Sequence, residues 1–220
     1  MTIKKIKKNF FILSAFTLFL GFPIKSVFSQ ELTSQRNGFG TRLALFTTTS
    51  LEPVLGSLTN KNNPDKLIAA AFKFGMFVSA FTRLNIEYNE KVIPRLLPQG
   101  QSFLEGDTAL VYEIFHIVAN KTMNLVDAFG EHETNIQLRA DHTEAEILSI
   151  LKQEVLVILS LILNAQEKFD GKNDQKDLIM EYQERFGLSK EDIESVSRRY
   201  SMQDLEALNQ GTGNPFERLK

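Results

Sequence analysis

The sequence predicts an all-α protein: a helical bundle of four to six helices around a central buried helix at about 144–169, with short C-terminal helices. Three observations predict this class. Apolar residues recur at spacings of three and four through most of the chain, and helix-starting motifs precede several of these runs. Residues 155–163 are apolar throughout except for Ser160, and a helix that is apolar on all sides lies inside a protein.

The first 29 residues have the order of a secretory signal peptide. Four lysines precede an apolar core at residues 10–20, a helix-breaking Gly and Pro follow, and a small side chain, Ser29, closes the segment. The apolar core of about 11 residues is shorter than the roughly 20 that span a bilayer. We expect cleavage between Ser29 and Gln30 and a periplasmic or secreted bacterial protein, with an uncleaved N-terminal anchor as the alternative.

The composition restricts the classes of partner and of catalytic chemistry that the chain can have. Removing the leader takes away five lysines and no acid, so 20 basic residues face 27 acidic ones and the net charge becomes −7. Nucleic acid and anionic lipid both attract clustered Lys and Arg, so an acidic chain disfavours either as a partner. The chain has no cysteine, which excludes thiol catalysis, disulfides and a lipid anchor on cysteine.

The start of the processed chain carries weak signals. Residues 30–40 are polar and contain two glycines, which predicts a linker. For residues 41–58 we expect two short helices, because a run of three threonines and Pro53 disfavour one continuous helix. A strand at 41–49 is the alternative.

The Asn-Pro-Asp motif at residues 63–65 predicts the start of a helix that runs to about residue 89. Small side chains recur every four residues on one of its faces, and bulky aromatic ones follow another: Ala71, Gly75 and Ser79, then Phe74, Phe77 and Phe81. A ridge of small residues lets another helix approach closely. We interpret this segment as a buried core helix. A ligand pocket floored by Gly75 and a membrane-active segment are the alternatives.

Residues 90–106 contain two prolines and two glycines and predict a long loop. Asp107 then begins a helix that we expect to end at Gly130, a residue suited to the turn after a helix. The capping box Thr143-x-x-Glu146 opens the central helix, which we expect to run to about Phe169.

After Phe169 the apolar positions become sparse and the segments short. We expect helices at 175–186, at 189–200 opened by Ser189, and at 202–209 opened by Ser201, which either wrap the bundle or form an arm for a partner. The expected divisions are a signal peptide, a linker, a bundle domain, a set of short amphipathic helices and a disordered tail, at 1–29, 30–40, 41–169, 170–210 and 211–220.

The sharpest polar pattern lies on the helix that begins at Asp107. Its members fall on one face, and apolar residues occupy the other: Glu113, His116, Asn120, Asn124 and Asp127, against Val111, Phe115, Val118, Leu125, Val126 and Phe129. Glu-x-x-His is an element of di-iron bundles, but such a site needs two of them and the chain has one. We interpret the stripe as water-facing, with a structural polar network and a metal or catalytic site as alternatives.

Two further segments are weaker metal candidates. Residues 131–146 hold His132 and His142 among several acids, but the two histidines are ten residues apart around an expected loop. Residues 170–181 resemble a calcium loop in three acidic positions, yet Gln175 stands where such a loop requires glycine. We expect neither segment to bind a metal.

No serine-hydrolase elbow, phosphate loop or dinucleotide fingerprint occurs in the chain. We therefore expect no catalytic residue, cofactor or metal, and a non-enzymatic protein that binds another protein of the cell envelope or a secreted target. Nucleic acid and a stable membrane span after leader cleavage are not expected. Candidate binding residues are Glu113, His116, Asn120 and Gly75.

Two other functions stay open. The small-residue ridge around Gly75 could line an apolar cavity, which favours a periplasmic carrier of lipid or another apolar small molecule. The pair Glu113 and His116 could belong to a metal-dependent enzyme.

Overall fold

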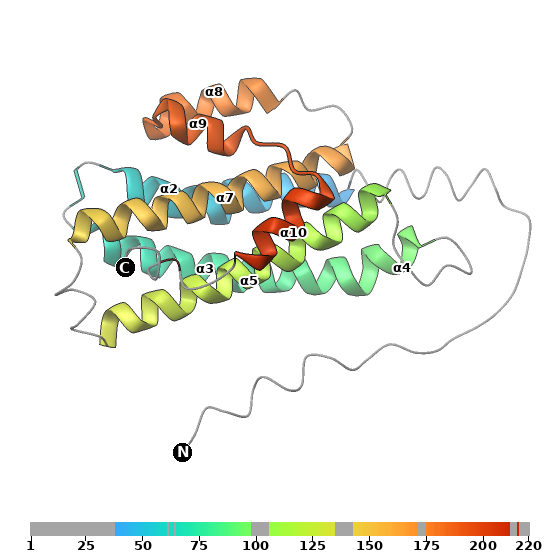
Figure 1. Ribbon diagram of the computed structural model, residues 1–220, viewed down its shortest axis with the longest axis horizontal. Helices are drawn as coiled ribbons and strands as arrows, with labels where there is room; N and C mark the ends of the chain where they lie inside the picture. The colour runs from blue at the N-terminus through green and yellow to red at the C-terminus, as the bar shows by residue number, and fades with distance from the viewer. Residues whose placement is uncertain are drawn as a thin grey trace, which may run out of the picture.

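The computed structural model in Figure 1 describes residues 38–60, 62–63, 65–97, 106–134, 143–170, 175–211 and Pro215. These residues are helical nearly throughout and include no strand, which confirms the all-α class. The expected signal peptide, its cleavage between Ser29 and Gln30, and all but two residues of the expected tail at 211–220 lie outside the described residues.

Four long helical segments form the bundle. The first comprises residues 38–46, the π-helical turn η2 (Thr47–Leu51) and α2 (Glu52–Thr59). The second comprises α3 (Lys66–Glu87), the π-helical turn η3 (Tyr88–Val92) and α4 (Ile93–Leu96). The others are α5 (Gly106–Thr134) and α7 (Glu144–Asp170). Because α2 contacts α3, α3 contacts α5, α5 contacts α7 and α7 contacts α2, the four segments close a ring (Figure 1).

An aromatic cluster joins the four segments, and each segment contributes one ring: Phe39, Tyr88, Phe115 and Phe169. The Phe39 ring centroid lies 5.4 Å from that of Tyr88 and 5.0 Å from that of Phe169. Aromatic pairs at such separations stabilise a core beyond the area they bury. Phe39 therefore corrects the expected linker at 30–40, whose described end at 38–40 is helical and contributes a fully buried core residue.

Two π-helical turns carry the chain past its prolines. Pro53 and Pro94 each stand at the start of the α-helix that directly follows a π-helical turn, so the wider turn lies where proline has no N–H to donate to the preceding helix. The expectation of two separate short helices at 41–58 is wrong, because η2 joins residues 38–46 to α2 in one uninterrupted helical run, and no strand forms at 41–49. The expected loop at 90–106 begins late, because helical structure continues through Leu96.

The observed helix ends show which of the predicted helix starts and ends are correct. α3 starts at Lys66 with Asp65 as its N-cap, while the Asn63 side chain accepts a hydrogen bond from the Asp65 amide at 3.0 Å. The capping box of α7 forms as predicted, because the Thr143 amide donates to Glu146 at 2.7 Å and Thr143 Oγ1 accepts from the Glu146 amide at 3.3 Å. The predicted end of α5 at Gly130 is wrong: glycine permits a turn without enforcing one, and α5 continues to Thr134.

The central helix is enclosed as predicted. Within residues 155–163 of α7, every side chain is buried except that of Val157, which is half-buried. The helix also carries a buried charge, since Glu154 accepts a hydrogen bond at 2.7 Å from Lys121 of α5 and both side chains are less than a tenth exposed.

Three short helices complete the described chain: α8 (Gln175–Phe186), α9 (Lys190–Val196) and α10 (Met202–Gln210). We call residues 175–211 the C-terminal segment. α8 packs on α2, α9 on α7 and α10 on α5, so this segment wraps the bundle (Figure 1). Ser189 opens α9 and Ser201 opens α10, as predicted, and each forms a complete capping box that was not predicted. α9 ends at Val196, before the expected limit at residue 200.

Candidate interaction surface

The polar stripe of α5 is partly covered by α10. Asn120 Nδ2 donates a hydrogen bond to Asn209 Oδ1 at 3.2 Å, so this side chain belongs to the α5–α10 contact. His116 and Asp127 are exposed, as a water-facing stripe predicts, whereas Glu113 and Asn124 are half-buried. The stripe therefore faces solvent at His116 and Asp127 and contacts the C-terminal segment at Asn120.

The opposite side of α5 packs largely as predicted. Val111, Phe115, Val118 and Leu125 are buried in the bundle. Val126 is exposed, so its assignment to the core is wrong. Of Phe129 the structure describes only the backbone.

Glu113 and His116 do not assemble a metal site in the described residues. Glu113 Oε2 lies 3.9 Å from His116 Nδ1, which is an ion-pair distance at the surface of one helix. The part of the chain that the structure describes contains no group of three His, Asp or Glu side chains that could hold a metal ion. The pair therefore has the geometry of a local i, i+3 contact.

The other metal candidates are only partly described. His142 lies outside the described residues, and His132 is described only as a backbone position near the end of α5. In the segment that resembles a calcium loop, Gln175 is buried and its Nε2 donates to the Leu163 carbonyl at 2.6 Å. Gln175 thus joins the start of α8 to α7 and points its amide at protein.

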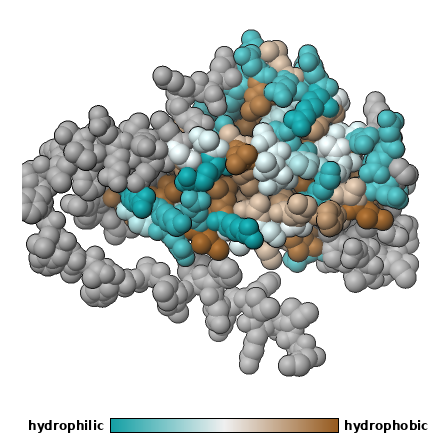
Figure 2. All heavy atoms as spheres, turned by 180° about the vertical axis from the view of Figure 1, so that it is seen from behind, coloured by the Kyte–Doolittle hydropathy of each residue, from teal (hydrophilic) through white to brown (hydrophobic). Residues whose placement is uncertain are grey.

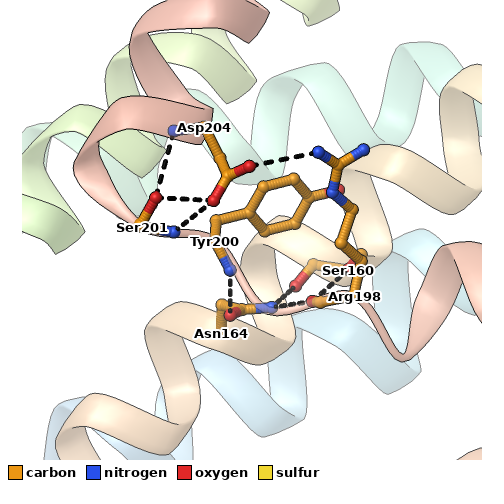
Figure 3. Close-up of polar contacts among 6 residues, drawn as sticks. All are labelled: Ser160, Asn164, Arg198, Tyr200, Ser201 and Asp204. Atoms are coloured by element: carbon orange, nitrogen blue, oxygen red, sulfur yellow. Dashed lines mark hydrogen bonds and ion pairs between the residues drawn. The ribbon is translucent and has the colours of Figure 1, made fainter.

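Sequence analysis did not identify a polar cluster on α7 that holds the C-terminal segment (Figure 3). Asn164 Nδ2 donates to the Arg198 carbonyl at 2.8 Å, and Asn164 Oδ1 accepts from the Tyr200 amide at 3.3 Å. Ser160 Oγ donates to the same Arg198 carbonyl at 3.1 Å. The two polar side chains thus satisfy the backbone between α9 and α10, which would otherwise be buried without partners.

A second contact fixes α9 to α7. Asp192 accepts hydrogen bonds from Lys152 Nζ at 2.8 Å, from Gln153 Nε2 at 3.0 Å and from the Ser189 amide at 2.9 Å. Burial acts to raise the pKa of Asp192, but the hydrogen bonds from Lys152 and Ser189 and the Lys152 charge outweigh it, so the pKa lies below its ordinary value.

A third contact fixes α8 to α2 through the buried carboxylate of Glu52. The Tyr182 hydroxyl donates to Glu52 Oε1 at 3.0 Å, and the Arg185 guanidinium donates to Glu52 Oε2. Burial, and then the Glu52 charge, raise the pKa of Tyr182 well above its ordinary value, so its hydroxyl stays a donor. Three buried polar contacts therefore hold the C-terminal segment against the bundle.

α3 has an apolar outer face that the bundle leaves open. We call it the α3 face, and its members are Ile68, Phe72, Gly75, Met76, Ser79 and Ile86. Ile68, Phe72 and Met76 are 69 %, 72 % and 59 % exposed. Figure 2, which views the molecule from behind, shows apolar side chains gathered across this side of the bundle. Such large apolar groups in water indicate a surface that binds something.

The position of Gly75 corrects the interpretation of this helix as fully buried. Gly75 is exposed, and a Cβ added to it would meet no atom within 4 Å. The aromatic stripe of α3 does face the core, where Phe77 stacks with Phe74 and with Phe81. Gly75 and Ser79 of the small-residue ridge therefore lie on the outer side of the helix, and Ala71 is half-buried.

α5, the neighbour of α3, has exposed apolar side chains of its own. The Phe81 and Phe115 ring centroids are 5.8 Å apart, so α3 and α5 are direct neighbours. Tyr112, Met123 and Val126 of α5 are all more than a third exposed. The helical run Lys66–Arg95 is also long and apolar enough to cross a membrane by length and composition alone, although 33 % of its most apolar window is buried in the bundle.

The sequence contains a signal for this surface that was not among the patterns used above. Ile68, Phe72 and Met76 repeat every four residues on the side of the helix away from Phe74 and Phe81. Two apolar faces on one helix fit a fully buried helix as well as a half-exposed one. The chain matches no family model, no curated protein and no solved structure, so the site must be argued from its geometry.

Proposed function

We propose that this chain is an exported bacterial helical protein that acts without catalysis, by binding another protein through the α3 face in the envelope or after secretion. The observation that carries the proposal is the exposure of Ile68, Phe72 and Met76 on one side of an otherwise packed helix. The leader-like first 29 residues support export, since they have the charged, apolar and small-residue order of a signal peptide.

The anatomy of the α3 face is that of a protein-binding surface. Aromatic and methionine side chains are the types enriched at interfaces, and Phe72 and Met76 supply them. Gly75 and Ser79 leave the helix backbone accessible between the larger side chains, which lets a partner helix come close. Arg83 and Lys73 are exposed beside the apolar residues and provide a polar rim.

A position-specific cross-link tests the proposal. A photoreactive phenylalanine analogue is introduced at Phe72 in the full chain and irradiated in the producing cells. The matched control carries the same analogue at Met180, a residue of α8 that is 47 % exposed. We expect a protein adduct at position 72 and none at position 180.

The cross-linking results either support or contradict binding at the α3 face. An adduct at position 72 that Gly75→Trp abolishes supports binding at this face, because the large indole would block close approach. Irradiation that yields no protein adduct at 72, in cells where the protein is folded and abundant, contradicts the proposal. Equal labelling at 72 and 180 contradicts it as well, because it indicates random collision.

A further inference from the structure

The α3 face is complementary to itself when two copies meet with their α3 helices antiparallel. In such a pair a two-fold axis passes beside one residue, and residues equally far from it on opposite sides lie against each other. The side chains of the α3 face are complementary when the two-fold axis passes at the level of residue 74 along the helix. Phe72 and Met76 lie two residues on either side of it, so the Phe72 ring of each copy meets the Met76 thioether of the other. Sulfur–aromatic contacts of this kind are favourable.

The same crossing point pairs a large side chain with a small one. Ile68 lies six residues before residue 74, so the exposed Ile68 of one copy lies opposite position 80 of the other, where the side chains of Ser79 and Ala80 are small. Gly75 lies next to the crossing point, where two helix backbones come closest and a large side chain would hold them apart. The face therefore offers both the projections and the recesses of a helix–helix contact.

Charge selects the antiparallel orientation. Asp65 and Arg83 are both exposed and lie nine residues before and nine after residue 74. They are 18 residues apart, which is about five turns, so they lie along the same edge of the helix. An antiparallel pair brings each Arg83 to the Asp65 of the other copy. In a parallel two-fold pair the same edges of the two helices lie on opposite sides of the interface, so neither Arg83 nor Asp65 meets the opposite charge of the other copy.

The apolar side chains near the crossing point supply about half of the area that a stable dimer uses. Ile68, Phe72 and Met76 are 69 %, 72 % and 59 % exposed. At on the order of 200 Å² for each full side chain they present roughly 400 Å². Each partner of a standard interface buries about 800 Å², and the polar side chains beside these residues add to the apolar area.

We propose that the partner of the α3 face is a second copy of this chain, and that the protein is a two-fold dimer with antiparallel α3 helices crossing near residue 74. This inference rests on the proposed function, because it names the protein that the face binds. An anionic membrane surface is the competing occupant, since Lys73 and Arg83 flank the apolar residues. The matched placement of Asp65 opposite Arg83 favours the second copy, because a membrane surface gains nothing from the acid.

Sedimentation of the purified exported protein measures the association. We expect twice the chain mass at micromolar concentration. Phe72→Glu places two charges in the interface and should weaken dimerisation at least 100-fold, whereas Met180→Glu on α8 should leave it unchanged. Asp65→Arg and Arg83→Asp alone should each weaken it on the order of tenfold, and the double variant should restore it. Circular dichroism checks that each variant is folded.

The absence of cysteine makes an orientation test available. Gly75→Cys and Ile86→Cys each add a single thiol to the same exposed face. In the antiparallel pair the two Gly75 positions are adjacent, whereas the two Ile86 positions lie about 36 Å apart along the helices at 1.5 Å per residue. Oxidation should link Gly75→Cys into dimers and leave Ile86→Cys monomeric, because a disulfide needs Cα atoms within about 7 Å.

Each contrary result overturns the inference in a different way. Disulfides from both variants indicate a parallel pair. A monomer at all concentrations excludes the dimer. Flotation of that monomer with vesicles of phosphatidylglycerol, lost in Phe72→Glu, assigns the face to a membrane. A photo-adduct at position 72 that contains a different protein, with a monomer in sedimentation, preserves the proposed function and refutes self-association. Loss of the adduct altogether refutes both.

Discussion

α3 and α7 are both long apolar helices of the same bundle, yet α7 is enclosed and α3 is open on one side. Their polar side chains explain the difference. Ser160 and Asn164 of α7 bond the backbone of the C-terminal segment, which covers the helix. Ser79 and Thr82 of α3 return their hydroxyls to carbonyls of their own helix, at 3.3 Å and 2.9 Å.

This comparison shows that hydropathy alone does not decide burial. A polar group within an apolar helix draws another element toward it, because its buried hydrogen bonds must be satisfied. Ser79 and Thr82 make no such demand on the rest of the chain. The apolar outer face of α3 is thus available to a partner.

The sharpest way to break the comparison uses two phenylalanines of α3 that are two positions apart. Phe74→Ala opens a cavity in the core and should lower the free energy of unfolding by about 3–5 kcal/mol. Phe72→Ala removes an exposed ring and should change the stability of the monomer by less than about 0.5 kcal/mol. Urea unfolding at low protein concentration measures both. Similar losses at the two positions would contradict the assigned outer face.

Some of these features could be predicted from the sequence, and others could not. The helix starts at Thr143, Ser189 and Ser201 were predictable because a capping box involves only four consecutive residues. Which side of α3 meets the core depends on how α5 packs, so the exposure of Phe72 was not predictable. Phe39 was assigned to a linker for the same reason, since its ring packs against residues of three distant segments.

The buried ion pair between α5 and α7 should be the next most sensitive feature. Lys121→Ala removes the ammonium that faces the buried Glu154 carboxylate and should cost about 3–5 kcal/mol. Lys168→Ala is the matched control, because Lys168 pairs at 3.0 Å with Asp107 between the same two helices at the surface. An exposed pair contributes about 0–1 kcal/mol. Denaturant unfolding that gives equal losses would show that burial of the pair is wrong.

The polar cluster on α7 provides a further test of the difference between α7 and α3. Asn164→Ala removes the hydrogen bonds to Arg198 and Tyr200 and should destabilise the protein by about 2–3 kcal/mol. Hydrogen exchange should show faster exchange of α10 amides before any change in α7. Thr82→Ala, which removes a hydroxyl bonded only within α3, should leave both exchange and stability nearly unchanged. Uniform acceleration across the chain would refute a local role for Asn164.

The smallest expected effect is a pH dependence at the α7–α9 contact. The pKa of Asp192 is below its ordinary value in the folded protein, so Asp192 stabilises the fold above the unfolded pKa of about 3.9. That contribution is lost as the pH falls through the folded pKa. The stability difference between wild type and Asp192→Asn should therefore be full at pH 5 and above and should shrink below about pH 4. A stability difference that stays constant down to pH 2 would contradict the claim that the ionised Asp192 carboxylate stabilises the fold.

The central claim is that the outer face of α3 is covered by protein in the working molecule while the outer face of α8 is not. Two methionines report on it directly, since Met76 and Met180 are 59 % and 47 % exposed in the single chain. Their rates of oxidation by peroxide can be followed by mass spectrometry in the producing cells and in dilute purified protein. The account predicts that Met76 is protected in cells and becomes reactive on dilution, whereas Met180 reacts equally in both. Equal reactivity of Met76 in the two states would contradict it.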